Sequence, residues 1–160
     1  MTVYRASWIL PVVGAPIADG WVAVEHGRIA GVGDGDMQDA VDLGQVVILP
    51  ALVNTHTHLE LSYLRGVVPP AHGFLDWIGQ VIAARRRLSD PEDAAILQSA
   101  RAGIEEARAS GTGLVGDVSN TLVTVPLLRE ASISARVFYE LLGFNPDDPL
   151  GLVRDARARV

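Results

Sequence analysis

The residues best suited to chemistry in this sequence are two histidines separated by a single residue. Residues 54–58 read Asn-Thr-His-Thr-His and directly follow an apolar run. In extended backbone the side chains of residues i and i+2 point to the same side, so His56 and His58 can present both imidazoles to one ion. Such a pair also arises by chance in exposed loops. Whether the pair is a metal site or a chance occurrence therefore depends on the structural element in which it lies.

Other ligands and acid/base groups must come from histidine and carboxylate side chains. Cysteine is absent, which excludes disulfides, thiolate nucleophiles and cysteine-ligated zinc. Glu60 lies two residues beyond His58, and we expect it to contact substrate, to hydrogen-bond to a ligand or to hold a loop. Asp117 and Glu140 lie near the ends of two later predicted strands, where we expect a hydrogen-bonding or substrate-binding role.

The predicted elements after residue 45 alternate between strand and helix. The run VVILPALVN is almost continuously apolar, which is typical of a parallel strand buried on both faces. The elements predicted after it are a helix over 74–87, a helix opening at Asp90-Pro91-Glu92-Asp93 and burying Ile96, Ala100, Ile104 and Ala107, a strand over 112–118, a helix over 123–130, a strand over 135–142 and a helix from Asp147. This order predicts a parallel α/β fold, with His56 and His58 at the carboxyl end of its first strand.

An antiparallel unit is predicted before this fold. Residues 3–10 and 21–32 are rich in β-branched and aromatic side chains, with turn signals at Gly14, Pro16 and Asp19-Gly20. The second run turns back at residues 25–28, which places His26 in a hairpin tip. Residues 33–42 are polar and glycine-rich, as expected of a loop.

The segment VVILPALVNTHTHLELSYLRG, preceded by a β-rich stretch, resembles the start of the barrel in the amidohydrolase superfamily. The resemblance continues through GFLDWIGQVIAARR, GTGLVGDVSNT and ARVFYELLGF, and it is strongest to the deaminase and chlorohydrolase branch. The wording HTHLELS is similar to the aminodeoxyfutalosine deaminase group. Two departures are Ala51 after Pro50, where the family usually has glycine, and Arg85 to Arg87, where methylthioadenosine and adenosylhomocysteine deaminases carry a ribose-binding glutamate.

The resemblance implies an α/β fold: the N-terminal part of a (β/α)8 TIM barrel, preceded by strands of a small β-sandwich. Residues 1–48 would be the sandwich part, and residues 49–160 the first three βα units. It implies one divalent metal, zinc or else iron, with His56 and His58 as its first two ligands. The remaining ligands and the acid/base carboxylate would come from strands beyond Val160, so this stretch alone is expected to lack a complete catalytic site.

The implied activity is metal-dependent hydrolysis of a non-peptide C–N bond, the deamination of an aminopurine nucleoside such as aminodeoxyfutalosine. Guanine deamination, chlorohydrolysis and a non-catalytic truncated remnant are the alternatives. Trp77 stands where this branch commonly has an aromatic residue, to stack on substrate or to pack in the core. Arg65 and His72 lie in the loop above the first strand, a substrate-facing region.

The composition limits the partners. Hydrophobic residues make up 49% and charged residues 20% of the 160 residues, and the net charge is −6. This acidic balance disfavours a nucleic-acid partner, which needs clustered cations. The apolar stretch around Trp8 is too short to cross a membrane and is interrupted by Pro11. We therefore expect a cytoplasmic enzyme with a small-molecule substrate; a homo-oligomer is compatible with the sequence.

Overall fold

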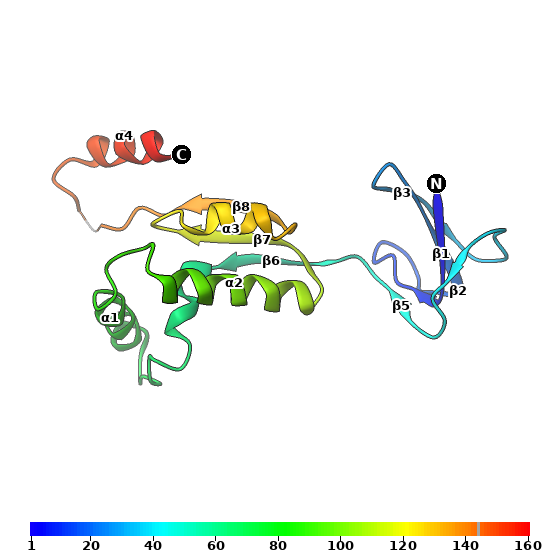
Figure 1. Ribbon diagram of the computed structural model, residues 1–160, viewed down its shortest axis with the longest axis horizontal. Coiled ribbons are helices and arrows are strands. Elements are labelled where there is room, and N and C mark those ends of the chain that lie inside the picture. Colours follow the sequence, from blue (N-terminus) through cyan, green and yellow to red (C-terminus); the bar gives the residue numbers. More distant parts are fainter. Residues whose placement is uncertain (144) are drawn as a thin grey trace. The chain divides into compact units, whose positions relative to one another are not determined.

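The computed structural model describes residues 1–143 and 145–160 and divides the chain into two compact units, Met1–Ala51 and Leu52–Val160 (Figure 1). The first unit is a small sheet, and the second combines a parallel sheet with helices. The predicted alternation of strand and helix is thereby confirmed. None of the described helices is long and apolar enough to cross a membrane.

The first unit contains the strands β1 (Thr2–Ile9), β2 (Ile17–Glu25), β3 (Arg28–Gly33), β4 (Val41–Asp42) and β5 (Val47–Ile48). Strands β1, β2 and β3 form an antiparallel meander. The short β4 and β5 both pair with β1 in parallel. His26 and Gly27 connect β2 to β3 with positive φ angles of 50° and 72°, the geometry of a two-residue hairpin turn. The predicted hairpin tip is confirmed.

The turn predicted at Asp19-Gly20 is wrong, because β2 begins at Ile17 and runs through both residues. Asp19 has a positive φ of 47°, but the pairing with β1 continues on both sides of it. Gly20 packs against Ile9, and a Cβ at this position would lie 2.6 Å from Cγ1 of that isoleucine. The glycine thus permits close packing in the core of the unit and does not form a turn.

The single strand predicted over residues 46–54 is wrong, because the run divides between the two sheets. Val47–Ile48 pairs with β1, and β6 (Leu52–Thr57) pairs with the second sheet. Pro50, which has no backbone N–H to donate, lies in the interruption. Burial on both faces is also wrong, since Leu52 and Val53 are 53% and 58% exposed. Successive side chains of a strand point to opposite faces, so both faces are uncovered at the start of β6, which is also an edge strand among the described residues.

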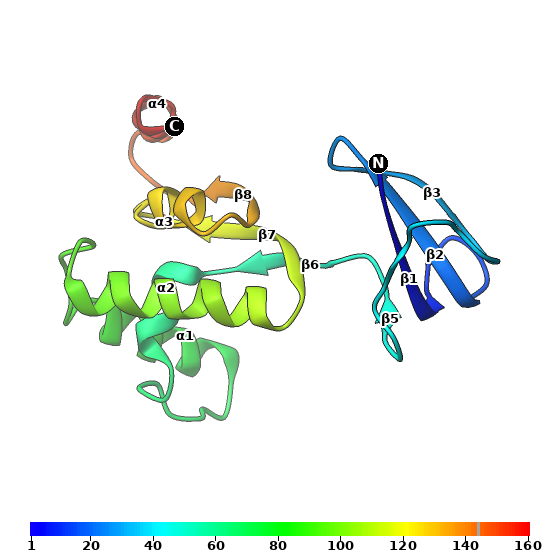
Figure 2. The same cartoon turned by 45° about the vertical axis from the view of Figure 1, so that its right-hand side comes forward.

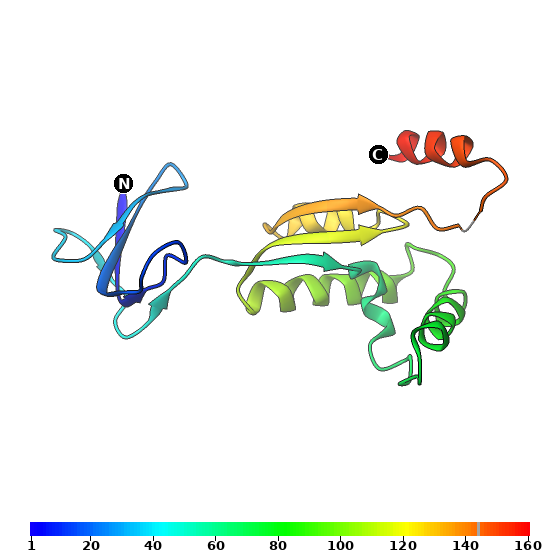
Figure 3. The ribbon, with the colours of Figure 1, turned by 180° about the vertical axis from the view of Figure 1, so that it is seen from behind.

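The second unit is a parallel sheet of order β6-β7-β8, with helices on one face (Figures 2 and 3). After β6 come a 3-10 helix, η1 (Leu59–Leu64), and then α1 (Phe74–Arg85), α2 (Ala94–Ala109), β7 (Thr112–Ser119), α3 (Thr124–Glu130), β8 (Ser134–Tyr139) and α4 (Pro149–Arg159). Helices α2 and α3 lie along the same face of the sheet, whereas α1 lies beyond the carboxyl ends of the strands. These carboxyl ends carry the candidate site.

One hydrophobic core joins η1, α2, α3 and β7. It consists of Leu59, Ala100, Ile104, Val115, Leu127, Leu128 and Ile133, all buried. The helical spacing of Ala100 and Ile104 places both on the face of α2 that covers the sheet, as predicted for them and for the buried Ile96. Ala107 is partly buried against the same core.

Two predicted boundaries shift, and a third is confirmed. Helix α2 begins at Ala94, and its N-cap is Asp93, whose carboxylate accepts the Ala95 N–H; Asp90 instead accepts the Glu92 N–H in the preceding turn. Strand β8 ends at Tyr139, where its pairing with β7 ends. At α4 the predicted start is confirmed, since Asp148 caps the helix and Pro149 is its first residue.

Candidate metal centre at the carboxyl end of the parallel sheet

His56 and His58 lie at the carboxyl end of β6 and turn their rings toward one another. Strand β6 ends at Thr57, so His56 is still extended backbone and His58 is the cap residue of η1. The two Nε2 atoms are 3.1 Å apart and the ring centroids 5.1 Å apart. The strand end therefore arranges the pair as the i and i+2 spacing predicts, and it brings the two Nε2 atoms close together.

This geometry fits two ligands of one metal ion. Imidazole nitrogens at about 2.0–2.1 Å from a tetrahedral zinc ion lie roughly 3.3 Å apart, close to the observed separation. Among the described residues no group of three or more histidine, aspartate or glutamate side chains is placed to hold a metal. Within that part of the chain the donor set therefore consists of His56 and His58, with further positions on the ion left for other ligands.

A hollow of about 870 Å³ opens beside the two histidines, and we call it the histidine hollow. Helix α1 contributes an apolar wall with Phe74, Trp77 and Val81. Where α1 ends, Arg85 joins Asn120 and Glu140 in a polar end of the lining. The hollow thus combines the histidine pair, an aromatic wall and a few polar groups, features that are typical of small-molecule sites.

Trp77 is on the wall of the histidine hollow and is 43% exposed. Its ring lies 5.8 Å from that of Phe74, tilted by 40°, an arrangement in which aromatic rings attract each other. Neither ring belongs to a hydrophobic core of the described residues, and Phe74 is 70% exposed, so the predicted packing of Trp77 in the core is not found. Stacking of Trp77 on substrate stays a prediction.

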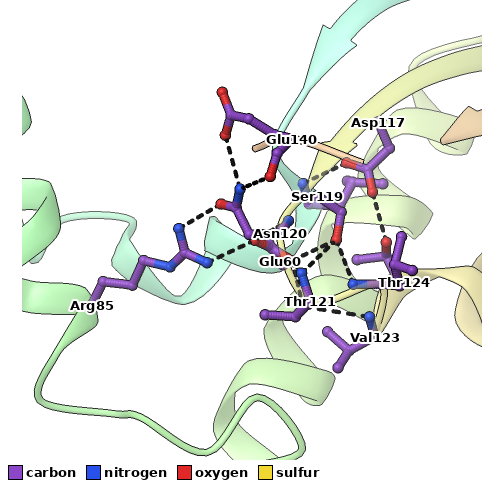
Figure 4. A network of polar contacts seen from close by, with 11 residues as sticks. Glu60, Arg85, Asp117, Ser119, Asn120, Thr121, Val123, Thr124 and Glu140 are labelled. Atoms are coloured by element: carbon purple, nitrogen blue, oxygen red, sulfur yellow. Dashed lines mark hydrogen bonds and ion pairs between the residues drawn. The ribbon is translucent and has the colours of Figure 1, made fainter. Parts of the chain in front are cut away.

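Glu60 is 3% exposed and accepts hydrogen bonds on both carboxylate oxygens (Figure 4). Oε1 accepts from the Asn120 N–H at 3.0 Å and from Arg85 at 3.1 Å. Oε2 accepts from the Ser119 hydroxyl at 2.6 Å and from the N–H and hydroxyl of Thr121. Glu60 thereby ties η1 to the residues that follow β7, and it is not part of the hollow wall.

The electrostatics of Glu60 follow from this balance of burial and donors. Burial raises the pKa of its carboxyl, but the hydrogen bonds from Ser119, Thr121 and Asn120 outweigh it and hold the pKa below the usual value. The carboxylate form of Glu60 is therefore favoured, because hydrogen-bond donors of the protein stabilise its charge in place of water. Such a carboxylate is poorly placed to exchange a proton with a substrate.

A chain of contacts runs from Glu60 to Glu140 through two side chains (Figure 4). The Arg85 guanidinium binds Glu60 and also donates to Asn120 Oδ1 at 2.7 Å. Asn120 Nδ2 in turn donates to the Glu140 carbonyl at 2.8 Å and to its carboxylate at 3.2 Å. These contacts fix the carboxylate of Glu140 at the polar end of the histidine hollow.

Asp117 is fully buried and lies behind the hollow rather than in it. On β7 it shares a face with Val115 and Ser119, two residues away on either side, and this face packs against the helices. Burial raises the pKa of Asp117, and the hydrogen bonds from Leu59, Thr124 and Thr57 only partly counter it. The sequence placed Asp117 at the correct strand end but did not show on which face it lies.

Four contributors to the network around Glu60 were not predicted. Ser119, Asn120 and Thr121 follow β7 as a polar run, a signal that points to a functional strand end once β7 is assigned. Arg85 is the fourth, near the end of the helix predicted over 74–87; its side chain is 27% exposed and pairs with Glu60, while Arg86 and Arg87 are exposed.

The two loop residues predicted to face substrate are separated by the structure. Arg65 borders the hollow and forms an ion pair of 2.7 Å with Glu106. His72 is exposed and is not part of the hollow wall.

Comparisons with known proteins place this architecture among characterised enzymes. The sequence model described as the amidohydrolase family matches residues 47–158. An adenosine deaminase from Helicobacter pylori is 37% identical over 101 residues, which cover 61% of this chain and 22% of that protein. A 5-methylthioadenosine/S-adenosylhomocysteine deaminase from Thermotoga maritima is 31% identical over 130 residues, covering 81% of this chain and 31% of that protein.

Solved structures extend the likeness to the whole chain. The crystal structure of Helicobacter pylori aminofutalosine deaminase in complex with methylthio-coformycin matches with a TM-score of 0.79 at 25% identity, covering 99% of this chain and 39% of that chain. A triazine hydrolase from Arthrobacter aurescens, 16% identical with a TM-score of 0.75, shares the fold. The predicted fold class, α/β and similar to part of an amidohydrolase barrel, is confirmed. The chain spans between about a fifth and two fifths of the length of these relatives.

Proposed function

Because the chain belongs to the amidohydrolase family, we propose that this protein is a metal-dependent deaminase that hydrolyses a C–N bond of an aminopurine nucleoside. The observation that carries the proposal is the convergence of His56 Nε2 and His58 Nε2, 3.1 Å apart, beside the histidine hollow. Deaminases among the relatives, on adenosine and on methylthioadenosine, support the reaction class. The likeness to an aminofutalosine deaminase supports aminodeoxyfutalosine as the substrate.

His56 and His58 would hold a divalent metal, zinc or else iron, in this site. When bound, such an ion lowers the pKa of a water ligand toward neutrality and so makes hydroxide available for hydrolysis. For this, both Nε2 atoms must be unprotonated, which requires the neutral imidazoles with their hydrogens on Nδ1. Glu60 and Asp117 are engaged with donors of the chain, so neither is proposed as the group that carries the proton to the leaving ammonia.

The wall of the histidine hollow suits a flat ring joined to a polar part. We propose that Trp77 stacks on the ring and that Glu140 binds hydrogen-bond donors of the polar part, such as sugar hydroxyls. The fixed position of Glu140, held through Asn120, supports this assignment. A further proposal is that residues 1–48 are part of a β-sandwich and residues 49–160 the first βα units of the barrel, which the division into compact units at Ala51 supports.

Release of ammonia tests the reaction class. We expect the full-length protein, loaded with zinc, to release ammonia from aminodeoxyfutalosine or from an adenosine derivative in a coupled assay. The panel includes guanine and a chlorotriazine, because the related folds include enzymes of both kinds. Turnover of amide or ester substrates alone would refute the proposal, and no turnover of any panel member would favour a non-catalytic protein.

Truncation of Trp77 tests the position of the ring. Stacking of a base on an aromatic side chain contributes about 1–3 kcal/mol, so Trp77→Ala should raise KM roughly tenfold with little change in kcat. The matched control is Trp8→Ala, since Trp8 is similarly exposed, at 45% against 43%, and lies on β1 of the other unit. Steady-state kinetics on the best panel substrate measure both variants. Equal KM values for the two variants would contradict stacking by Trp77.

A further inference from the structure

We propose that Asp117 positions His58 for metal binding by holding the backbone on both sides of that histidine. Asp117 with its two flanking contacts, Thr57 and Leu59, is called the Asp117 clamp below. This inference rests on the proposed metal site. It assigns a function to a carboxylate that lies behind the hollow and to a threonine that is not among the residues lining it.

The contacts of one carboxylate oxygen define the clamp. Asp117 Oδ1 accepts the Leu59 N–H at 2.8 Å and the Thr57 hydroxyl at 3.1 Å. Leu59 and Thr57 are the residues immediately after and before His58. The Thr57 hydroxyl also lies 3.2 Å from the Gly116 carbonyl, so its hydrogen is shared between two acceptors on β7. A single buried oxygen thus fixes both peptide neighbours of the histidine.

His58 needs such support because the regular ladder ends just before it. Strand β6 ends at Thr57, and its register with β7 shifts between Asn54 and Thr57. His58 itself has φ −128° and ψ 73°, outside helical and strand values, and its side chain makes no capping hydrogen bond. Without strand pairing at His58, the direction of its imidazole depends on how the flanking residues are held.

The second oxygen of the Asp117 carboxylate has a different hydrogen-bond donor. Asp117 Oδ2 accepts the hydroxyl of Thr124 at 2.7 Å, and Thr124 is fully buried at the start of α3. Oδ2 therefore has its own donor on α3, and Oδ1 is the oxygen that receives both neighbours of His58. The clamp acts on the histidine pair through the contacts of Oδ1.

The close approach of the two strands gives independent support. At Gly116, next to Asp117, a Cβ would lie 2.5 Å from the carbonyl oxygen of Thr55. A glycine is required here for β7 to come this near to the backbone between Asn54 and His56. The irregular register that this approach allows is what brings Asp117 Oδ1 opposite Thr57.

Two threonine-to-valine variants separate positioning from stability. Thr57→Val removes the contact of the clamp beside His58, whereas Thr124→Val removes a hydroxyl from the same carboxylate on the side away from it. Zinc affinity is measured on the full chain by competition with a chromophoric chelator, and stability by thermal unfolding without metal. We expect Thr57→Val to weaken zinc binding roughly tenfold, the lower end for residues that orient metal ligands, and Thr124→Val to change it less than about threefold.

Conservative replacement completes the test. Thr57→Ser retains the hydroxyl and should bind zinc as the unmodified chain does, which distinguishes the hydrogen bond from the methyl packing of Thr57. Zinc affinity that Thr57→Val leaves unchanged would overturn the clamp alone, as would an equal loss in Thr57→Val and Thr124→Val. Absence of zinc binding by the unmodified chain would overturn the proposed metal site, and the clamp with it.

Discussion

Replacement of either His56 or His58 by alanine is expected to lower kcat/KM of the full-length protein by at least about a thousandfold, or roughly 4 kcal/mol of transition-state stabilisation. A catalytic zinc ion normally has three protein ligands, so loss of one imidazole removes a third of the protein donors. The remaining histidine cannot chelate, because the observed site relies on two Nε2 atoms 3.1 Å apart. Metal content should fall in parallel.

The matched control is His26→Asn, which removes an imidazole from the hairpin turn of the first unit. Asparagine tolerates the positive φ of 50° at this position, so the turn should persist. We expect unchanged turnover and metal content in this variant. Metal is measured by elemental analysis after gel filtration, and activity before and after dialysis against chelator. Activity that survives chelation, or a His56→Ala protein with full metal content, would exclude the proposed site.

Removal of the Glu60 carboxylate is expected to cause the largest loss of stability. Glu60→Ala leaves Arg85, Ser119 and Thr121 without their acceptor in a site where water has little access. Breaking a buried ion pair by removing one partner costs about 3–5 kcal/mol of the free energy of unfolding, and Glu60 is 3% exposed. Glu60→Gln should lose less, because one amide oxygen can still accept hydrogen bonds.

Glu130→Ala is the matched control, since Glu130 also pairs with an arginine, Arg101, but its side chain is 60% exposed. Exposed pairs contribute little, so this variant should change the free energy of unfolding by less than about 1 kcal/mol. Urea unfolding followed by the fluorescence of Trp77, with Trp8 and Trp21 replaced by phenylalanine, reports on the second unit. Equal losses in the free energy of unfolding for Glu60→Ala and Glu130→Ala would show that the network around Glu60 stabilises the fold no more than an exposed ion pair does.

Together these contacts describe a site whose carboxylates have different tasks. Glu60 and Asp117 satisfy backbone and side-chain donors behind the strand ends. Glu140 lies on the wall of the histidine hollow, at the far end of the contacts that begin at Glu60. The buried carboxylates therefore make the strand ends rigid, and rigid strand ends are what orient groups for binding and catalysis.

Local patterns were enough to predict several helices, the hairpin at His26 and the histidine pair, but not the division of residues 46–54 between two sheets. The apolar spacing of α2, the capping residues of α4 and the turn at His26 act over a few residues, where backbone geometry and hydrogen bonding are set by the residue types themselves. The convergence of His56 and His58 follows from the two-residue period of a strand. In each of these features, the residues that contact one another in the structure are also close together in the sequence.

The partners of Glu60 and Asp117 could be recognised only in the tertiary structure. Glu60 meets Ser119 and Thr121 across separations of 59 and 61 residues, and Asp117 meets Leu59 across 58. Which side of β7 faces the helices, and where the register with β6 shifts, depends on how the core packs. A carboxylate two residues from a proposed metal ligand can therefore be directed into the core or into the hollow by packing alone. In this protein that packing directs Glu60 and Asp117 into the core, while Glu140 reaches the hollow.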